Sequence, residues 1–354
     1  MGYTYTIDAQ AMFEDRTSQF ESFGVPAAEV REVRAAVDDM WRDGPGGWTY
    51  EWSKVAARHA AAGEHYLASL VYGCAKFPCL AGQTNRVRSL AMQVKEYVAA
   101  SPAFPVRFER RILQIPYRGR VAAVPVHLYS SKDDVSKTPV LITSGGVDTW
   151  KMDIHPMALA FAKLGLTVLA FDQPGTGEST ATLTKEADEV VLGLVREARA
   201  IGNGWVAHFG LSFGANFAAM TGLSGAVNAA VVLGGPTDKS FAEEHLGKLP
   251  YGMFDILGNA MGFDHHPGVS ELTSVARGLS RHDLLQQQEN APMLVINGAD
   301  DYFVPQDDTM VFTGRPDTLV RLLRDTGHCA VSKMPEVMAM TIEWLRERLA
   351  IDAR

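Results

Sequence analysis

The sequence predicts an α/β protein, with a mostly parallel sheet covered by helices on both faces and a helical segment in front of it. From about residue 106 onward, short apolar runs alternate with helical stretches, which is the pattern of a parallel sheet between helices. In residues 1–105 the apolar positions recur at three- and four-residue steps, and no β alternation is visible. We therefore expect a helical domain at 1–105 and an α/β domain at 106–354.

Apolar spacing and chain breakers place the helices of the first segment. The expected helices are 27–41, 50–77 and 84–100. A Gly-Pro-Gly-Gly run at 44–47 follows the first, and Pro78 ends the second, since both sequences interrupt a helix. The second is either one long helix or two helices joined near Gly63.

The second segment opens with a hairpin and continues as alternating strands and helices. Strands at 106–115 and 121–129 flank a short turn around Gly119, which is typical of a hairpin. The further strands are 140–143, 166–171, 205–211, 229–233, 293–296 and 318–323. The helices between and after them are 155–164, 185–201, one from 215 onward, and 336–349. A helical insertion fills 236–291.

Composition narrows the class of protein. Lys and Arg number 33 against 41 Asp and Glu, so the net charge of −8 argues against a nucleic-acid partner and a membrane-surface partner. Three cysteines are too few for a disulfide scaffold, and no apolar run is long enough to cross a membrane. The first residues lack the basic and apolar regions of an export signal, so we expect a cytoplasmic protein.

One motif predicts a nucleophile. The Gly-Leu-Ser-Phe-Gly segment at 210–214 follows an expected strand and precedes an Ala-rich helix. In this setting a tight turn lifts Ser212 above the sheet, and the small residues on either side let the backbone turn without a Cβ clash.

A serine nucleophile needs a base and an acid that orients the base. Of the ten histidines, His328 is the candidate base because it follows the last expected strand, where catalytic groups of open α/β sheets gather. Asp301 is the candidate acid, with Asp300 as its near rival and Asp238 as a more distant one.

Backbone N–H groups should hold the developing oxyanion. Phe213 directly follows the nucleophile, and Gly146 lies in the Ser-Gly-Gly-Val-Asp loop at 144–148, with Val147 as the alternative. The glycine-containing segment at 171–179 lacks the third glycine of a dinucleotide motif, so it is interpreted as a structural turn. We expect no cofactor and no metal ion.

The chain order Ser212, Asp301, His328 resembles that of the α/β-hydrolase superfamily over residues 106–354. The glycine-containing loop and the helical segment in front are similar to the group that holds 2,6-dihydroxypseudooxynicotine hydrolase, the fungal polyketide-shortening hydrolases and the FrsA-like proteins. The resemblance implies an N-terminal helical cap over the active site, a homodimer, and a catalytic triad of Ser212, His328 and Asp301.

The resemblance also implies a reaction class. The expectation is a serine hydrolase that cleaves a carbon–carbon bond next to a carbonyl in a small apolar or aromatic substrate. The alternatives are a carboxylesterase, lactonase or thioesterase, and a non-enzymatic regulatory or binding protein of the FrsA-like type. Family members that hold substrate with a glutamate suggest Glu243 or Glu244 for that role; Val147 and Trp150 are further candidate substrate contacts.

Overall fold

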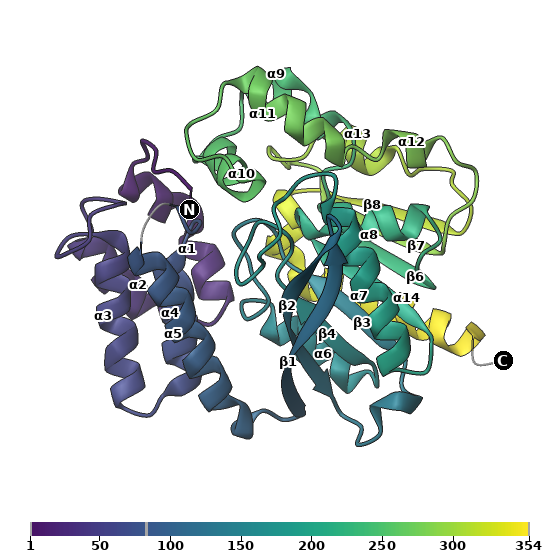
Figure 1. Ribbon diagram of the computed structural model, residues 1–354, viewed down its shortest axis with the longest axis horizontal. Coiled ribbons are helices and arrows are strands. Elements are labelled where there is room, and N and C mark those ends of the chain that lie inside the picture. The colour runs from purple at the N-terminus through teal and green to yellow at the C-terminus, as the bar shows by residue number, and fades with distance from the viewer. Residues whose placement is uncertain (1, 82–83, 353–354) are drawn as a thin grey trace.

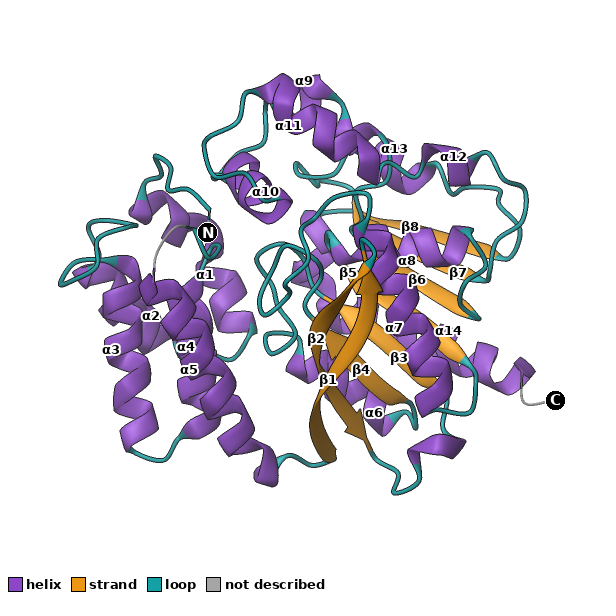
Figure 2. Ribbon diagram, in the orientation of Figure 1, coloured by secondary structure: helices purple, strands orange, loops and turns teal. Residues whose placement is uncertain are grey.

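The computed structural model describes residues 2–81 and 84–352, which contain an eight-stranded sheet in the order β1-β2-β4-β3-β5-β6-β7-β8 (Figures 1 and 2). Strands β3 to β8 pair in parallel, whereas β1 and β2 form an antiparallel hairpin and β2 joins β4 antiparallel. The strands are β1 Arg107–Tyr117, β2 Arg120–Ser130, β3 Val140–Ser144, β4 Thr167–Phe171, β5 Val206–Leu211, β6 Ala229–Leu233, β7 Met293–Gly298 and β8 Thr318–Leu323. The predicted fold class is confirmed, and the strands lie within about two residues of the expected positions.

Both faces of the central strands are buried because the side chains of a strand alternate between the two faces. In β3, Val140 and Ile142 belong to one hydrophobic cluster and Leu141 to another. The first cluster packs against α7 (Ala187–Ile201) and α8 (Gly214–Leu223), and the second against α6 (His155–Lys163) and α14 (Met334–Asp352). Near-continuous apolar runs in β3 to β7 follow from this double burial.

The N-terminal helices pack around a core of their own, beside the sheet (Figure 1). They are α1 Ala9–Ser22, α2 Ala27–Ala36, α3 Trp48–Ala61, α4 His65–Lys76 and α5 Thr84–Ala100. The expected break near Gly63 is present, with that glycine at a φ of +76°. The helix expected at 27–41 is shorter than predicted, because Val37 is extended and the Asp39 carboxylate accepts the N–H groups of Trp41 and Arg42 in a turn.

The segment between β6 and β7 is helical, as expected, and lies over the carboxyl ends of the strands (Figure 1). Its helices are α9 Glu243–Leu246, α10 Met253–Met261, α11 Val269–Ala276 and α12 His282–Leu285; the short α13 Gln306–Met310 follows β7. Asp308 of α13 anchors the start of the segment, since its carboxylate accepts the backbone N–H groups of residues 237–240 at 2.6 to 3.1 Å. In the part of the chain that the structure describes, no helix has the length and apolar character needed to cross a membrane.

Candidate active site

Ser212 occupies a strained turn between β5 and α8. Its φ of 55° lies in the left-handed region, which is uncommon for a residue other than glycine. A Cβ at Gly214 would lie 2.6 Å from the carbonyl oxygen of Ser144, so a larger residue there would collide with the neighbouring strand. The glycine therefore lets the turn pack closely enough to present the serine at the edge of the sheet.

Ser212, His328 and Asp301 form one hydrogen-bonded chain, although they come from three different loops. Nε2 of His328 lies 2.8 Å from Oγ of Ser212, and Nδ1 of His328 lies 2.7 Å from Oδ2 of Asp301. With Nδ1–H donating to the carboxylate, Nε2 is left to accept the serine proton. The two distances are within the range that proton transfer and orientation of a base require.

Asp301 is fixed by more than the histidine. Its side chain is fully buried; Oδ1 accepts the N–H of Phe303 at 2.8 Å, and Oδ2 accepts the amide of Asn297 at 2.8 Å. The rival Asp300 is exposed, and Asp238 accepts a hydrogen bond from Ser280 Oγ instead. Of the three aspartates, only Asp301 lies against His328.

Interactions among the hydrogen-bonded residues shift the pKa values of both Asp301 and His328. Burial alone would raise the pKa of Asp301, but the His328 charge and the hydrogen bonds from His328, Asn297 and Phe303 outweigh it and lower the pKa. Burial would lower the pKa of His328, whereas the neighbouring Cys329 and the Asp301 carboxylate raise it well above the ordinary 6.5. The imidazolium form that arises when the serine loses its proton is therefore stabilised.

The β3–α6 loop, residues 145–154, lies against the serine. A Cβ built on Gly146 would be 2.8 Å from both Cβ and Oγ of Ser212 and 3.6 Å from the backbone nitrogen of Phe213. None of the hydrogen bonds among the described residues uses the N–H of Gly146, Val147 or Phe213. These N–H groups, which lie in the segments next to Ser212, thus have no protein acceptor among the described residues and are the candidate donors to an oxyanion.

A cavity opens above Ser212 and His328, with about 450 Å³ of space between atoms when the part open to solvent is included. Its walls come from the β3–α6 loop, the segment after β6, and the loop after β7. The apolar lining residues are Val147, Phe213, Pro236, Phe241, Leu246, Leu249, Met253, Leu257, Phe303 and Val304. Ser240 and His245 are the polar lining side chains besides Ser212 and His328. Ser240 is engaged, since its hydroxyl donates to Asp308 at 2.6 Å.

Several expected substrate contacts lie elsewhere. Glu243 and Glu244 are exposed and do not line the cavity, and Glu244 pairs with Lys248 at 2.7 Å. Trp150, within the loop, is buried, and the centre of its ring lies 3.9 Å from the amino group of Lys76. Val147 is the one of the four that lines the cavity. The other three, Glu243, Glu244 and Trp150, do not line the cavity in which substrate contacts were expected.

Two features of the site were not expected. His245, one residue beyond the two glutamates, lines the cavity, and its Nε2–H donates to the carbonyl of Phe303 at 2.8 Å. The only sequence signal for it was its place on the same short helix. In addition, no described residue from 1–105 lines the cavity, so the helices over the serine are those of the segment after β6.

The comparisons with known proteins agree with this architecture. A family model described as "Esterase FrsA-like" matches residues 34–350. The esterase FrsA of Photobacterium profundum is 26% identical over 333 residues, which cover 86% of this chain and 77% of the relative. The hydrolyase poxO of Penicillium oxalicum is 28% identical over 168 residues, 42% of this chain and 39% of the relative.

Solved structures share the fold over nearly the whole chain. AbyA5 superposes with a TM-score of 0.77 at 21% identity, covering 95% of this chain and 98% of its own. The 2,6-dihydroxy-pseudo-oxynicotine hydrolase gives a TM-score of 0.74 at 20% identity, covering 95% and 96%. These structures show the α/β-hydrolase fold of the chain. Together with the family match over residues 34–350, they place this protein in the FrsA-like family of the α/β-hydrolase superfamily.

Proposed function

We propose that this hydrolase uses Ser212 as a nucleophile and cleaves a carbon–carbon bond next to a carbonyl in a small, largely apolar compound. The observation that carries the proposal is the chain of hydrogen bonds from Ser212 through His328 to Asp301 at the floor of an apolar cavity. Binding of an apolar substrate there removes water from the site and strengthens its electrostatic interactions.

The reaction begins when His328 Nε2 takes the Ser212 proton and Oγ bonds to the carbonyl carbon. The oxyanion accepts hydrogen bonds from the N–H groups of Phe213 and Gly146, each worth about 3 kcal/mol. The bond to the leaving carbon then breaks, and its electron pair passes to a second carbonyl as an enolate, which His328 protonates. Water, deprotonated by His328, then adds to the acyl carbon. As the bond to Oγ breaks, His328 returns the proton to Ser212, which releases a carboxylic acid and restores the free serine.

The fold shared with 2,6-dihydroxy-pseudo-oxynicotine hydrolase over 95% of the chain supports cleavage of a carbon–carbon bond. Ester hydrolysis is the second candidate, because the relatives that match 86% or more of this chain carry the name esterase. The same residues serve either bond, since an ester needs only an alkoxide leaving group.

A paired substrate panel tests the proposal. We expect turnover of β-diketones by the wild-type protein and loss of that turnover, by about 10⁴-fold or more, in Ser212→Ala. Turnover of p-nitrophenyl esters without any turnover of diketones would favour the esterase. Equal rates in wild type and Ser212→Ala on every substrate would refute the nucleophile. If neither protein exceeded the uncatalysed rate, the result would support a non-enzymatic role.

A further inference from the structure

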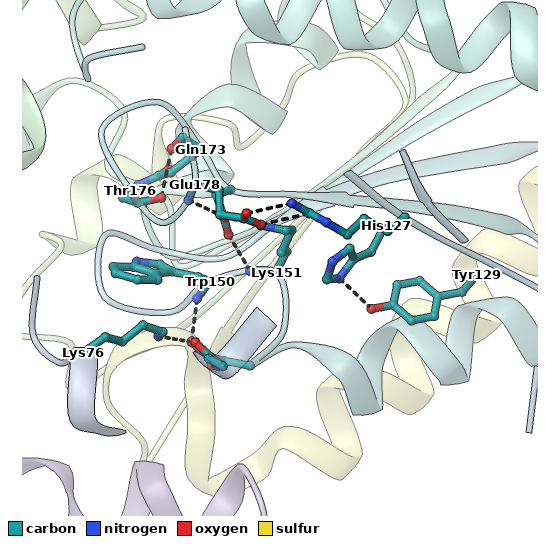
Figure 3. Close-up of polar contacts among 12 residues, drawn as sticks. Lys76, His127, Tyr129, Trp150, Lys151, Gln173, Thr176 and Glu178 are labelled. Atoms are coloured by element: carbon teal, nitrogen blue, oxygen red, sulfur yellow. Dashed lines mark hydrogen bonds and ion pairs between the residues drawn. The ribbon is translucent and has the colours of Figure 1, made fainter. Parts of the chain in front are cut away.

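Two buried lysines hold the β3–α6 loop, which carries Gly146 and Val147, from opposite sides (Figure 3). Lys151 lies within the loop and Lys76 at the end of α4, and both side chains are at most 2% exposed. Buried charges of this kind need partners, because an unpaired ion in a low-dielectric interior is strongly destabilising.

Lys151 ties the loop to the sheet region. Its amino group contacts the carboxylate of Asp172 and lies 2.7 Å from Glu178, and its backbone N–H donates to Asp172 at 2.8 Å. Glu178 in turn accepts two hydrogen bonds from the guanidinium of Arg110, at 2.8 and 2.9 Å. Figure 3 shows Lys151 and Glu178 facing each other on one side of the loop.

Lys76 ties the same loop to the N-terminal helices. Its Nζ donates to Oδ2 of Asp153 at 3.0 Å and lies over the ring of Trp150 (Figure 3). That carboxylate also accepts the backbone N–H of Trp150 at 2.8 Å and the side-chain amide of Gln93, from α5, at 2.9 Å. Asp153 therefore joins two helices to the backbone of the loop in one buried cluster.

A second set of contacts comes from α1. The guanidinium of Arg16 lies 3.1 Å from the Asp148 carboxylate, and the amide of Gln19 donates to the hydroxyl of Thr149 at 3.1 Å. Three of the N-terminal helices, α1, α4 and α5, thus contact the β3–α6 loop directly. None of their described residues lines the cavity, so they reach the site through neighbouring segments. This loop is one of them, and Phe303, whose ring lies under the Arg16 guanidinium, is another.

We propose that Lys76 is a positioning residue for the hydrolysis. Through Asp153 it fixes the β3–α6 loop at the distance from Ser212 that lets Gly146 donate to the oxyanion. Through this loop the N-terminal helices then act on the chemical step. This inference rests on the proposed function, because it assumes that the loop supplies an oxyanion donor.

The test compares Lys76→Met with Arg86→Met. Arg86 is a matched control: it is a fully buried cation on α5 that lies over the ring of Trp41 and donates to the carbonyl of Met40, neither of which belongs to the loop. Both variants are titrated with a fluorophosphonate so that rates refer to reactive serine. A loop displacement of about 1 Å lowers kcat on the order of 10- to 100-fold. We therefore expect that loss in Lys76→Met, with KM changed by less than about twofold, and an unchanged kcat in Arg86→Met.

Two further measurements separate positioning from general destabilisation. An alkyl boronic acid, which mimics the tetrahedral intermediate, should bind Lys76→Met more weakly by the same factor as kcat falls. Amide hydrogen exchange of residues 146–153 should accelerate in Lys76→Met and not in Arg86→Met, and this readout needs no activity.

The outcomes distinguish the two proposals. If the wild type shows no turnover that depends on Ser212, the proposed function fails, while hydrogen exchange still reports whether Lys76 holds the loop. If the wild type is active and the two methionine variants have the same kcat, the same boronic acid affinity and the same exchange, Lys76 has no positioning role.

Discussion

At the scale of single residues, the pairing of Asp301 with His328 predicts the pH dependence of the reaction. The base must be neutral to accept the Ser212 proton, and its pKa is raised well above 6.5. We expect kcat/KM to fall as the pH drops through that raised pKa. In Asp301→Asn the carboxylate charge is gone, so the midpoint should move to lower pH, and kcat should fall on the order of 10³- to 10⁴-fold. A pH–rate profile measures both effects.

Asp300→Asn is the matched control for this prediction. Asp300 precedes Asp301 in the same loop, but it is exposed, and the carboxylate that pairs with His328 is that of Asp301. We expect its rate and its pH profile to equal those of the wild type. A larger loss at Asp300 than at Asp301 would show that the acid has been assigned to the wrong residue.

A second residue-scale prediction concerns Gly146. A Cβ at this position would lie 2.8 Å from Ser212 Oγ, which is closer than side-chain carbons pack, so Gly146→Ala must displace the serine or the loop. We expect kcat to fall about 100-fold or more while the fold is retained. Gly268→Ala is the control, because a Cβ there meets nothing within 4 Å. Equal kcat values in the two variants would contradict the close approach.

The candidate site also shows what residue-level reasoning could and could not predict. Ser212 lies on a local strand–turn–helix motif, and the loops that bear Asp301 and His328 follow parallel strands whose carboxyl ends meet at one edge. Proximity of these three was therefore predictable. Glu243 and His245 lie on a four-residue helix, too short for any periodicity to tell which side faces the cavity.

At the scale of elements, the errors have physical causes. Apolar steps continue from Val37 to Trp41, but the carboxylate of Asp39 captures two N–H groups and ends the helix at Ala36. The spacing of apolar residues carries no information about such side-chain hydrogen bonds. The strands were easier to predict, because burial on both faces makes their apolar runs continuous.

The element over the site predicts substrate size. Met253 of α10 lines the cavity, so Met253→Ala enlarges the space that a substrate chain can fill. Each added methylene that is buried there should gain about 1 kcal/mol, which would move the optimum of a p-nitrophenyl ester series toward longer acyl chains. The measurement is kcat/KM across chain lengths.

Met338→Ala provides the comparison for this series. Met338 of α14 is also partly buried, but it packs in the cluster on the opposite face of the sheet from α7 and α8. It should leave the preferred chain length unchanged. If Met253→Ala gave the same optimum as Met338→Ala, α10 would not contact the substrate.

At the scale of the whole molecule, the N-terminal helices have a hydrophobic core of their own, and they join the sheet region through apolar contacts of α5, such as those of Leu90 and Tyr97, as well as through polar contacts. Phe13, Phe20, Trp48 and Trp52 belong to the core of the helices, whereas the two other clusters flank the sheet. Lys76 and Asp153 are 77 residues apart in the chain. No local pattern predicts a contact between such distant residues. The sequence therefore predicts the helical segment and the sheet region, but not the contacts between them.

This arrangement predicts that a substitution that disrupts the core of the N-terminal helices also lowers the activity of the site. Trp48 is fully buried, and its indole N–H donates to the carbonyl of Cys74 at 2.8 Å, two residues before Lys76. Trp48→Ala should lower the free energy of unfolding by about 3–5 kcal/mol, whereas Tyr50→Ala, 41% exposed on the same helix, should change it by less than about 0.5 kcal/mol. Helix content by circular dichroism and hydrolysis should be lost at the same, lower temperature in Trp48→Ala. Hydrolysis that outlasted the loss of helix would mean that the β3–α6 loop keeps its position without α1, α4 and α5.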